Sequence, residues 1–233
     1  MEMAYCTSYK LHEKKKNIAI IPVGSVEQHG PHLPLGTDTI IPYELAKRIS
    51  KNNNDKVIIA PPIFYGRSYF HKSFLGTISI RGEILVEFIE DVLCEFARNG
   101  VKKIILMNGH GGNVPSIKLA VEKFYRESSY EAKIFLVNWW ELPNVKSIVN
   151  VEKDIHAGRL ETSIMLALGY EIKNELIIDG KHTSDLFEEV VDVGQFTKSG
   201  VIGSPTESSK SEGHKIIDEV VAKVMEIINN EGG

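Results

Sequence analysis

Four side chains that could bind a metal ion lie close together near the start of the chain. Glu27, His29, His32 and Asp38 stand among glycines and prolines, after an apolar run at residues 18–23 that is typical of a buried strand. Carboxylate oxygens and imidazole nitrogens are ligands of divalent metal ions. Because the glycines and prolines argue against a helix, the sequence predicts that this cluster lies on a shaped loop at the end of a strand.

Two further clusters repeat this arrangement. His110 lies in an Asn-Gly-His-Gly-Gly-Asn segment at 108–113, directly after a second apolar run, and His156 and Glu161 open an apolar, helix-like stretch. A single cluster of this kind is most often a solvated loop. Three of them, each at the end of a strand or the start of a helix, favour a metal site.

The residue types in these clusters suit two metal ions better than one. Glu27 and His29 are two positions apart, so in an extended chain their side chains point to the same side. Asp38 offers two oxygens for a bridging position, while His110 and Glu161 add a nitrogen and a carboxylate. Five ligands exceed the need of one tetrahedral ion and suit two divalent ions about 3.5–4 Å apart.

Strand and helix patterns alternate along the chain. Apolar runs predict strands at 18–23, 56–60, 103–107 and 133–138, and amphipathic patterns predict helices at 40–51, 82–99, 114–127, 160–169 and 208–229. Residues 172–207 are punctuated by glycine and suggest only short extended pieces. The expected fold class is therefore α/β, a three-layer αβα sandwich around a mostly parallel sheet.

This expected sheet explains how distant clusters could meet. In such folds, ligands bind outside the carboxyl ends of the strands. The first two clusters directly follow predicted strands, so we expect them on one edge of the sheet, facing one pocket. No linker, repeat or low-complexity segment divides the chain, and one domain over residues 1–233 is expected.

Composition narrows the class of partner. The formal net charge is −4 and the longest basic run is three lysines, so no nucleic-acid partner is expected. No stretch has the length and apolar purity of a membrane span. Cys6 and Cys94 offer no disulfide framework and fit a reducing compartment. We therefore expect a soluble, cytoplasmic protein.

The three clusters together resemble the creatininase (creatinine amidohydrolase) family. The resemblance rests on Glu-Gln-His-Gly-Pro-His-Leu-Pro at 27–34 with Asp38, on the segment at 108–113, and on His-Ala-Gly at 156–158 with Glu161-Thr162-Ser163. Segments at 66–77 and 199–206 follow the family's pattern more weakly. The resemblance implies a creatininase-like fold and a binuclear metal site whose ligands match Glu27, His29, Asp38 and His110.

One position departs from this pattern. In creatinine hydrolase itself a carboxylate stands two residues after the histidine of the Asn-Gly-His motif, where this chain has Gly112. Glu161 is the expected replacement. The resemblance also implies that His156 is the catalytic acid or base, although the residues alone favour a structural histidine there. Because family members are often oligomeric, a homo-oligomer is expected.

Among the family's reactions, we expect the removal of formate from 2-amino-5-formylamino-6-ribosylaminopyrimidin-4(3H)-one 5'-monophosphate. The chain is short, as are the archaeal deformylases of riboflavin and F420 biosynthesis, and Gly112 lacks the creatininase carboxylate. Resemblance to those enzymes implies Fe(II) plus a second ion, which could be zinc, manganese or iron. The expected substrate is a small molecule, with or without a phosphate, and its expected contacts are His71, Trp139 and Trp140. His71 could reach the pocket of its own chain or that of a neighbouring subunit, and one tryptophan ring could be core while the other stacks on the substrate.

Two alternatives stay open. Creatinine or another cyclic amide could be the substrate of the same metal-dependent amide hydrolysis. A metal-binding scaffold without turnover is a more remote alternative. The chain retains five candidate ligands together with His156. An inactive relative would have no chemical reason to keep them, which argues against this alternative.

Overall fold

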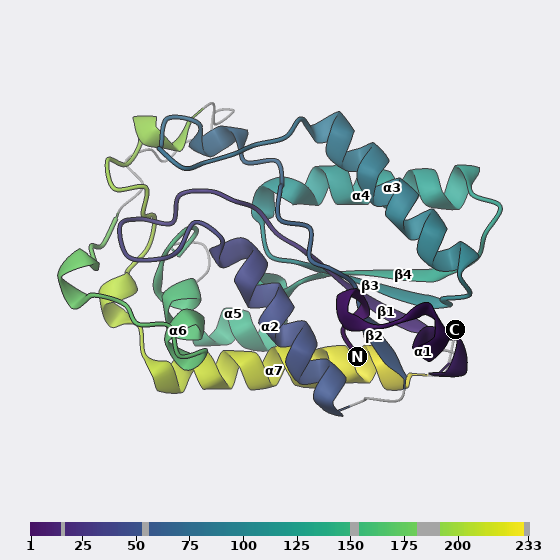
Figure 1. Ribbon diagram of the computed structural model, residues 1–233. Coiled ribbons are helices and arrows are strands. Elements are labelled where there is room, and N and C mark those ends of the chain that lie inside the picture. The colour runs from purple at the N-terminus through teal and green to yellow at the C-terminus, as the bar shows by residue number, and fades with distance from the viewer. Residues whose placement is uncertain (15–16, 53–55, 150–153, 181–191, 231–233) are drawn as a thin grey trace.

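A parallel sheet of four strands forms the centre of the molecule (Figure 1). The computed structural model describes residues 1–14, 17–52, 56–149, 154–180 and 192–230. The strands are β1 (Ile18–Val23), β2 (Val57–Ile59), β3 (Lys103–Asn108) and β4 (Lys133–Asn138), in the order β2-β1-β3-β4. Every neighbouring pair in this sheet is parallel, with Ile18 of β1 opposite Val57 of β2 and Lys103 of β3. The predicted parallel sheet is confirmed.

Helices connect these strands. The described α-helices are α1 (Ser8–Lys14), α2 (Thr37–Asn52), α3 (Gly82–Arg98), α4 (Val114–Glu127), α5 (Pro143–Ile148), α6 (Arg159–Ala167) and α7 (Lys210–Asn229). Single 3-10 turns are η1 (Met3–Tyr5), η2 (Tyr69–His71), η3 (Gly111–Asn113), η4 (Trp139–Glu141), η5 (Asn174–Leu176), η6 (Val193–Gln195) and η7 (Pro205–Glu207). Several of the turns lie within the stretch at 172–207 where the sequence pattern is irregular.

The sheet is covered on both faces, as predicted for an αβα sandwich. Helices α3 and α4 lie on one side of it and α2, α5, α6 and α7 on the other (Figure 1). Ile21 of β1 packs with Leu85 of α3, while its neighbour Ile20 packs with Leu45 of α2. Successive side chains of a strand point to opposite faces, so β1 is apolar throughout and fully buried.

Helix ends follow local signals in the sequence. Gly100 follows the C-cap residue Asn99 of α3 and has a φ of +87°, the left-handed conformation that glycine supplies at helix ends. The Ser209 hydroxyl accepts a hydrogen bond from the Glu212 N–H at the start of α7. The short helices α1 and α5 were not predicted, because seven and six residues are too few to show a helical period.

Helix α2 begins one turn earlier than the sequence pattern predicts. It starts at Thr37 rather than near residue 40, so Asp38 lies in its first turn and is not on the loop. The loop prediction for this one residue is wrong, because a carboxylate is favourable at a helix N-terminus. This places Asp38 beside the carboxyl ends of β1 and β3, the inner pair of strands.

The described helices are shorter or more polar than a helix that crosses a lipid bilayer. None of them combines the length and the apolar character that crossing a membrane requires.

Candidate metal centre

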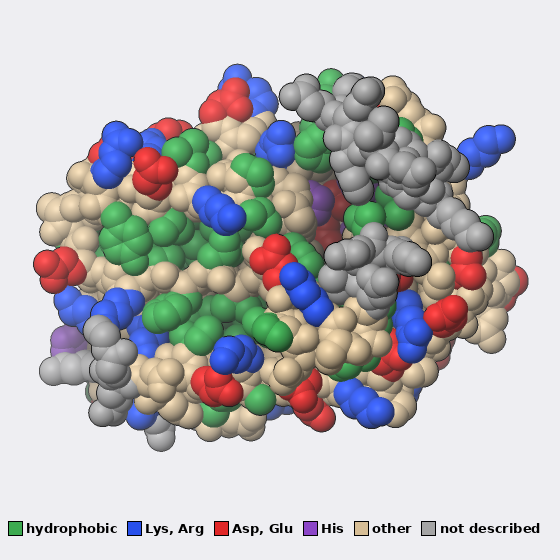
Figure 2. Space-filling view, turned by 180° about the vertical axis from the view of Figure 1, so that it is seen from behind, with side chains coloured by type: hydrophobic (Ala, Val, Ile, Leu, Met, Phe, Trp, Pro, Cys, Tyr) green, Lys and Arg blue, Asp and Glu red, His purple; other side chains and the backbone are tan. Residues whose placement is uncertain are grey.

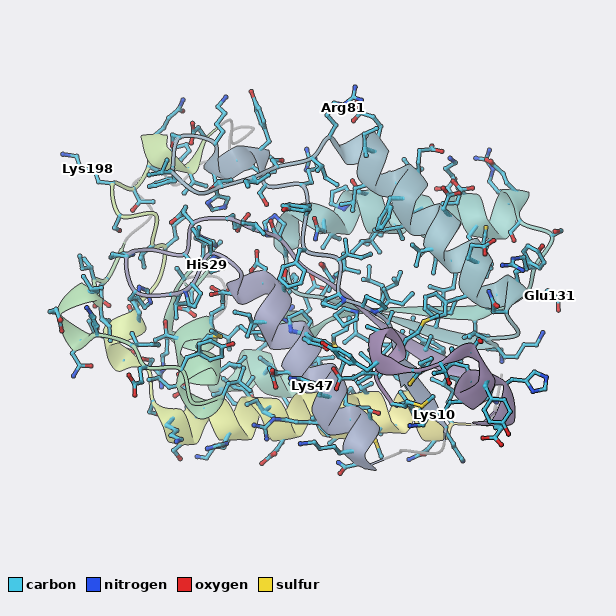
Figure 3. All side chains as sticks on the ribbon, viewed as in Figure 1. Lys10, His29, Lys47, Arg81, Glu131 and Lys198 are labelled. Atoms are coloured by element: carbon cyan, nitrogen blue, oxygen red, sulfur yellow. The ribbon has the colours of Figure 1, made fainter. Side chains whose placement is uncertain are left out.

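The predicted ligands converge at the carboxyl edge of the sheet from four separate segments. Glu27 and His29 lie on the loop after β1, Asp38 at the start of α2, His110 after β3, and Glu161 in the first turn of α6. His29, labelled in Figure 3, lies where α2 begins. The chain leaves β1 and β3 on this edge, at the point where the strand order reverses, which is the usual ligand site of such sheets.

Asp38 lies between two of the histidines. Its Oδ1 is 3.0 Å from His29 Nε2, and its Oδ2 is 3.0 Å from His110 Nδ1. The carboxylate is almost completely buried, with 2% of the residue exposed. Each of its two oxygens therefore faces a different nitrogen, which is the arrangement expected of a carboxylate that bridges two ions.

Glu27 is the second fully buried carboxylate of the centre. Its Oε1 lies 3.3 Å from His110 Nδ1, 3.5 Å from His71 Nε2 and 3.7 Å from His156 Nδ1. Neither carboxylate oxygen of Glu27 forms a hydrogen bond. A buried oxygen without a partner is costly, and a bound cation is one way in which it could be satisfied.

Backbone carbonyls fix which nitrogen of each histidine faces the centre. His29 Nδ1 lies 3.1 Å from the Glu27 carbonyl, and His110 Nε2 lies 3.1 Å from the Arg67 carbonyl. An imidazole N–H donated to a carbonyl leaves the other nitrogen with a free lone pair. Nε2 of His29 and Nδ1 of His110 are thus the free atoms, and both are directed at Asp38.

These lone pairs face the lone pairs of carboxylate oxygens, so a positive charge must lie between them. Although burial opposes it, the Glu27 and Asp38 carboxylates raise the pKa of His110 to about 9. Burial also disfavours the charged form of Asp38, but His29 and His110 hold its pKa well below the usual range. Burial raises the pKa of Glu27 to about 7. These opposed shifts mark a position between the carboxylates and the imidazoles where a positive charge is favourable, and a bound divalent ion would supply that charge.

Three groups of side chains place their ligand atoms close enough to hold an ion. Within each group these atoms lie within 4.8 Å of one another. The first group joins Asp38 to Glu27 and His110, and the second joins Asp38 to His29 and Glu161. A third group joins Glu27 and His29 to His156. The donor set therefore fits the predicted two-ion centre, with Asp38 shared between the first two groups.

Glu161 reaches the centre from α6. Its Oε1 lies 3.7 Å from His29 Nε2, and its Oε2 accepts a hydrogen bond of 2.7 Å from the Ala157 N–H. One oxygen is therefore held by the backbone while the other faces His29. His32 lies beside this helix, where its Nε2 is 2.9 Å from the Thr162 hydroxyl. It is buried rather than solvated and belongs to no group of candidate ligands.

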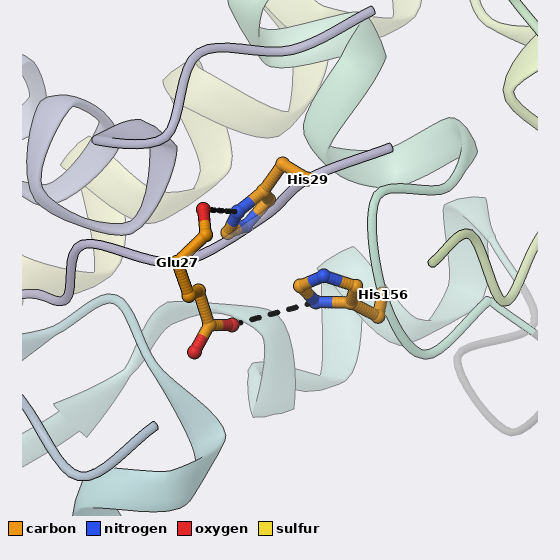
Figure 4. A group of neighbouring side chains, drawn as sticks. All are labelled: Glu27, His29 and His156. Atoms are coloured by element: carbon orange, nitrogen blue, oxygen red, sulfur yellow. Dashed lines mark hydrogen bonds and ion pairs between the residues drawn. The ribbon is translucent and has the colours of Figure 1, made fainter. Parts of the chain in front are cut away.

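His156 lies beside Glu27 and His29 (Figure 4), with its ring centroid 4.4 Å from that of His29. Its Nε2–H donates a hydrogen bond of 2.7 Å to the Gln28 carbonyl, so Nδ1 carries the lone pair that faces the centre. Burial, together with the neighbouring His29, lowers the pKa of His156 to about 4. The neutral imidazole presents a proton acceptor to the centre, and the same atom could also serve as a ligand.

Gln28 connects the histidines and was not among the predicted site residues. Its side-chain N–H donates to His71 Nδ1 at 2.8 Å and to the Gly200 carbonyl at 3.2 Å, while its Oε1 accepts from the Gly30 N–H. The His71 ring lies 4.3 Å from that of His156. The position of Gln28 between two candidate ligands was the signal available in the sequence.

His71 reaches the centre of its own chain. The sequence left open whether His71 serves its own chain or a neighbouring subunit. His71 lies in η2 with only 6% of the residue exposed, next to Glu27 of the same chain. Burial and the nearby His156 lower its pKa to about 2, so the ring is neutral. Its place in the cavity is compatible with the predicted contact to substrate.

A cavity of about 690 Å³ opens above these side chains. Its walls include Trp139 and Trp140, whose rings meet edge to face at 5.7 Å between centroids. Trp139 is buried in the core, whereas Trp140 is partly exposed, as expected for one core ring and one that could stack on substrate. Figure 2 shows the hollow from behind, with histidine and acidic side chains deep inside it.

Gly112 leaves no room for the carboxylate that the family resemblance leads one to expect at this position. A Cβ at this position would lie 2.4 Å from the Arg67 carbonyl oxygen and 2.4 Å from His110 Nε2. The same close approach lets the Arg67 carbonyl orient His110. Glu161 instead supplies a carboxylate to the centre from a different element.

Sequence comparison relates the whole chain to known hydrolases. The model of the family described as Creatininase, creatinine amidohydrolase, matches residues 2–228. The mycofactocin precursor peptide peptidase of Mycolicibacterium smegmatis is 33% identical over 229 residues, 92% of this chain and 85% of that protein. Creatinine amidohydrolase of Pseudomonas putida is 27% identical over 236 residues, 92% of this chain and 89% of that protein.

A third relative carries the activity expected from the sequence. The 2-amino-5-formylamino-6-ribosylaminopyrimidin-4(3H)-one 5'-monophosphate deformylase of Methanocaldococcus infernus is 25% identical over 232 residues, 94% of this chain and 90% of that protein. It is thus similar over its length, at lower identity than the peptidase.

Solved creatininase structures share the fold. A zinc–zinc form of a creatininase mutant gives a TM-score of 0.86 at 24% identity, covering 99% of this chain and 97% of that chain. A manganese form gives a TM-score of 0.84 at 24% identity, covering 99% and 98%. Together with the family match and the convergent carboxylates and imidazoles, these relatives identify the chain as a member of the creatininase family, metal-dependent amidohydrolases that act on C–N amide bonds.

Proposed function

We propose that the centre holds two divalent ions, one bound by Glu27, Asp38 and His110 and the other by His29, Asp38 and Glu161. The observation that carries this proposal is the pair of lone-pair contacts at Asp38, where each carboxylate oxygen faces an imidazole nitrogen at 3.0 Å. Related creatininases occur in zinc–zinc and manganese forms, which supports either metal. Fe(II) with a second ion is the choice that a deformylase activity would favour.

His156 is proposed as the residue that moves the proton. Bound divalent ions would lower the pKa of a water molecule to near 7 and polarise an amide carbonyl. With Nδ1 unprotonated, His156 could accept a proton at the centre and pass it to the leaving nitrogen. Gln28 and His71 would hold the imidazole in this orientation.

Three classes of amide are candidates for the substrate. The identity of 33% to a peptide peptidase supports a peptide amide, while the deformylase relative and Gly112 support a formamide on a ribosylaminopyrimidine phosphate. Creatinine is supported by the relative from Pseudomonas putida. Among these, we place the two open-chain amides first, because Gly112 lacks the carboxylate of creatinine hydrolase and the cavity of about 690 Å³ has room for a larger molecule.

A direct assay separates these substrates. The purified protein would be loaded anaerobically with Fe(II), zinc or manganese, and its metal content measured. Formate release from the formylamino-pyrimidine phosphate, cleavage of short peptides and conversion of creatinine would then be followed in parallel. We expect turnover of an open-chain amide that stops when a chelator removes the ions. Creatinine as the only substrate would refute the ranking, and no turnover by metal-loaded protein would favour the scaffold alternative.

A further inference from the structure

Arg67 is held at the wall of the cavity by its own backbone. Its N–H donates a hydrogen bond of 2.9 Å to Asn113 Oδ1, and its carbonyl accepts from His110. The residue is half-buried and lines the same cavity as Glu27. Arg67 therefore orients the candidate ligand His110 with its backbone carbonyl and places its guanidinium at the cavity wall.

The guanidinium is positioned by three neighbours. It lies over the Phe70 ring at 5.0 Å from the centroid, and its Nη1 approaches the Gly112 carbonyl at 3.5 Å. The stem packs beside Gly82, where an added Cβ would lie 3.3 Å from Arg67 Cδ. A guanidinium fixed in this way has already lost much of the side-chain freedom that binding a ligand would otherwise remove.

The described residues also give Arg67 no carboxylate partner. Within the described parts of the chain, no Asp or Glu forms an ion pair with it, and its one side-chain hydrogen bond is the long contact to Gly112. Arg159 shows the contrast, since it binds Glu207 and Glu212 and does not line the cavity. A guanidinium has five N–H donors, so most of those on Arg67 are available to a ligand.

We infer that Arg67 binds an oxyanion on the substrate, a carboxylate or a phosphate, while the amide to be cleaved lies at the metal centre. This inference rests on the proposed amide hydrolysis and specifies its substrate class. Planar guanidinium groups bind carboxylates and phosphates through paired hydrogen bonds. Both open-chain candidates carry such an anion, the peptide at its C-terminus and the pyrimidine on its ribose, whereas creatinine carries none.

Matched substrate pairs test this inference and distinguish its two sources. One pair is the formylamino-pyrimidine with and without its 5'-phosphate. The other is a short peptide with a free C-terminal carboxylate and the same peptide with a C-terminal amide. For whichever amide the metal-loaded enzyme cleaves, we expect kcat/KM to be about 10- to 100-fold higher for the anionic member.

The variant Arg67→Gln should reduce this preference to near one, mainly through KM, and leave the metal content unchanged. Arg67→Lys should restore part of it, because a lysine keeps the charge without the planar fork. Arg98→Gln is the matched control, since Arg98 is exposed and pairs with Glu95 on the far end of α3. Lys146 is an exposed lysine that also lines the cavity. We expect Lys146→Gln to reduce the preference for the anionic substrate less than Arg67→Gln does.

The outcomes separate the inference from the proposed function. If the enzyme cleaves both members of a pair equally, or if Arg67→Gln leaves the preference unchanged, the anion site is refuted while amide hydrolysis stands. If neither pair is cleaved, the proposed substrates are refuted. The anion site is then tested by calorimetric titration of metal-loaded protein with inorganic phosphate. Equal affinity in the native protein and Arg67→Gln would then overturn the anion site, and a tenfold or larger loss in the variant would support it.

Discussion

Asp38 has the most demanding position of any single residue in the candidate centre. Each of its carboxylate oxygens lies 3.0 Å from a nitrogen of a different histidine, one from the β1 loop and one from the segment after β3. Among side chains of this length, only asparagine also has two polar atoms that could make both contacts, and asparagine lacks the negative charge. The bridging role proposed for Asp38 therefore depends on both its geometry and its ionisation.

Asp38→Ala should remove metal and activity together. We expect the affinity for metal to fall by more than the roughly 10- to 100-fold that loss of a supporting residue costs at a metal site. Elemental analysis of dialysed protein would measure the metal content. Asp38→Asn keeps the shape without the charge and serves as the matched control. Full occupancy in the alanine variant would show that Asp38 does not bridge the ions.

His156→Ala should retain the metals and lose turnover, by about 10²–10⁴-fold, the usual contribution of a general acid or base. This separation matters because Nδ1 of His156 lies close enough to Glu27 and His29 to be a ligand. Metal content and kcat measured on the same preparation would decide between the roles. Loss of one ion per chain would identify His156 as a ligand instead of a proton carrier.

At the scale of elements, the turn η3 brings the β3 strand end into the centre. Gly111 and Gly112 begin this turn, yet their surroundings differ. A Cβ at Gly111 would have nothing within 4 Å, whereas a Cβ at Gly112 would meet the Arg67 carbonyl and His110 at 2.4 Å. The sequence run of glycines does not show this difference, because it arises from the segment around Arg67 packing against the turn.

Gly112→Ala should destabilise the protein by about 1–3 kcal/mol through this overlap, and it should weaken metal binding by displacing His110. Gly111→Ala provides the matched control and should be close to neutral. Thermal unfolding of both variants, with and without metal, would measure the two effects. The same overlap argues that a glutamate at position 112 would damage the centre rather than create a creatinine hydrolase. Equal stability of the two alanine variants would contradict this account.

At the scale of the whole molecule, the centre couples metal binding to protonation. Although burial opposes it, the nearby Glu27 and Asp38 carboxylates raise the pKa of His110 to about 9. A metal ion requires the unprotonated imidazole, so uptake at pH 7 must release this proton. The raised pKa of His29 acts in the same direction.

The sign of the pH dependence follows from these shifts. His110 has a raised pKa, so its contribution to the free energy of unfolding is complete below pH 6.5 and is lost as the pH rises toward 9. We therefore expect the difference in Tm between metal-loaded and metal-free protein to widen from pH 6.5 to 9. Calorimetric titration in buffers of different ionisation enthalpy should also show proton release at pH 7. A constant difference in Tm with no proton release would contradict protonation of the empty ligand set.

Two expectations about the whole molecule stay predictions. One is that residues 1–233 form a single domain, and the other is that the protein is a homo-oligomer. Both could be measured on the native protein, the first by a single cooperative unfolding transition and the second by sedimentation equilibrium.

The sequence alone determined the strands, the long helices and the types of the candidate ligands. Short apolar runs such as 18–23 and 103–107, alternating with helical patterns, indicate the buried strands of a parallel sheet, and the spacing in α3 defines one apolar face. Carboxylates and imidazoles directly after two of these strands also indicated where ligands would gather. These features are local, so a short window of sequence contains them.

Only the tertiary structure decided how those residues are used. It placed Asp38 on a helix, assigned the free nitrogen of each histidine through carbonyls from other segments, and joined His71 to the centre of its own chain through Gln28. It also brought the Arg67 guanidinium, which has no carboxylate partner among the described residues, to the cavity wall. Each of these facts depends on contacts between segments tens of residues apart, and the packing of the sheet and its helices sets those contacts.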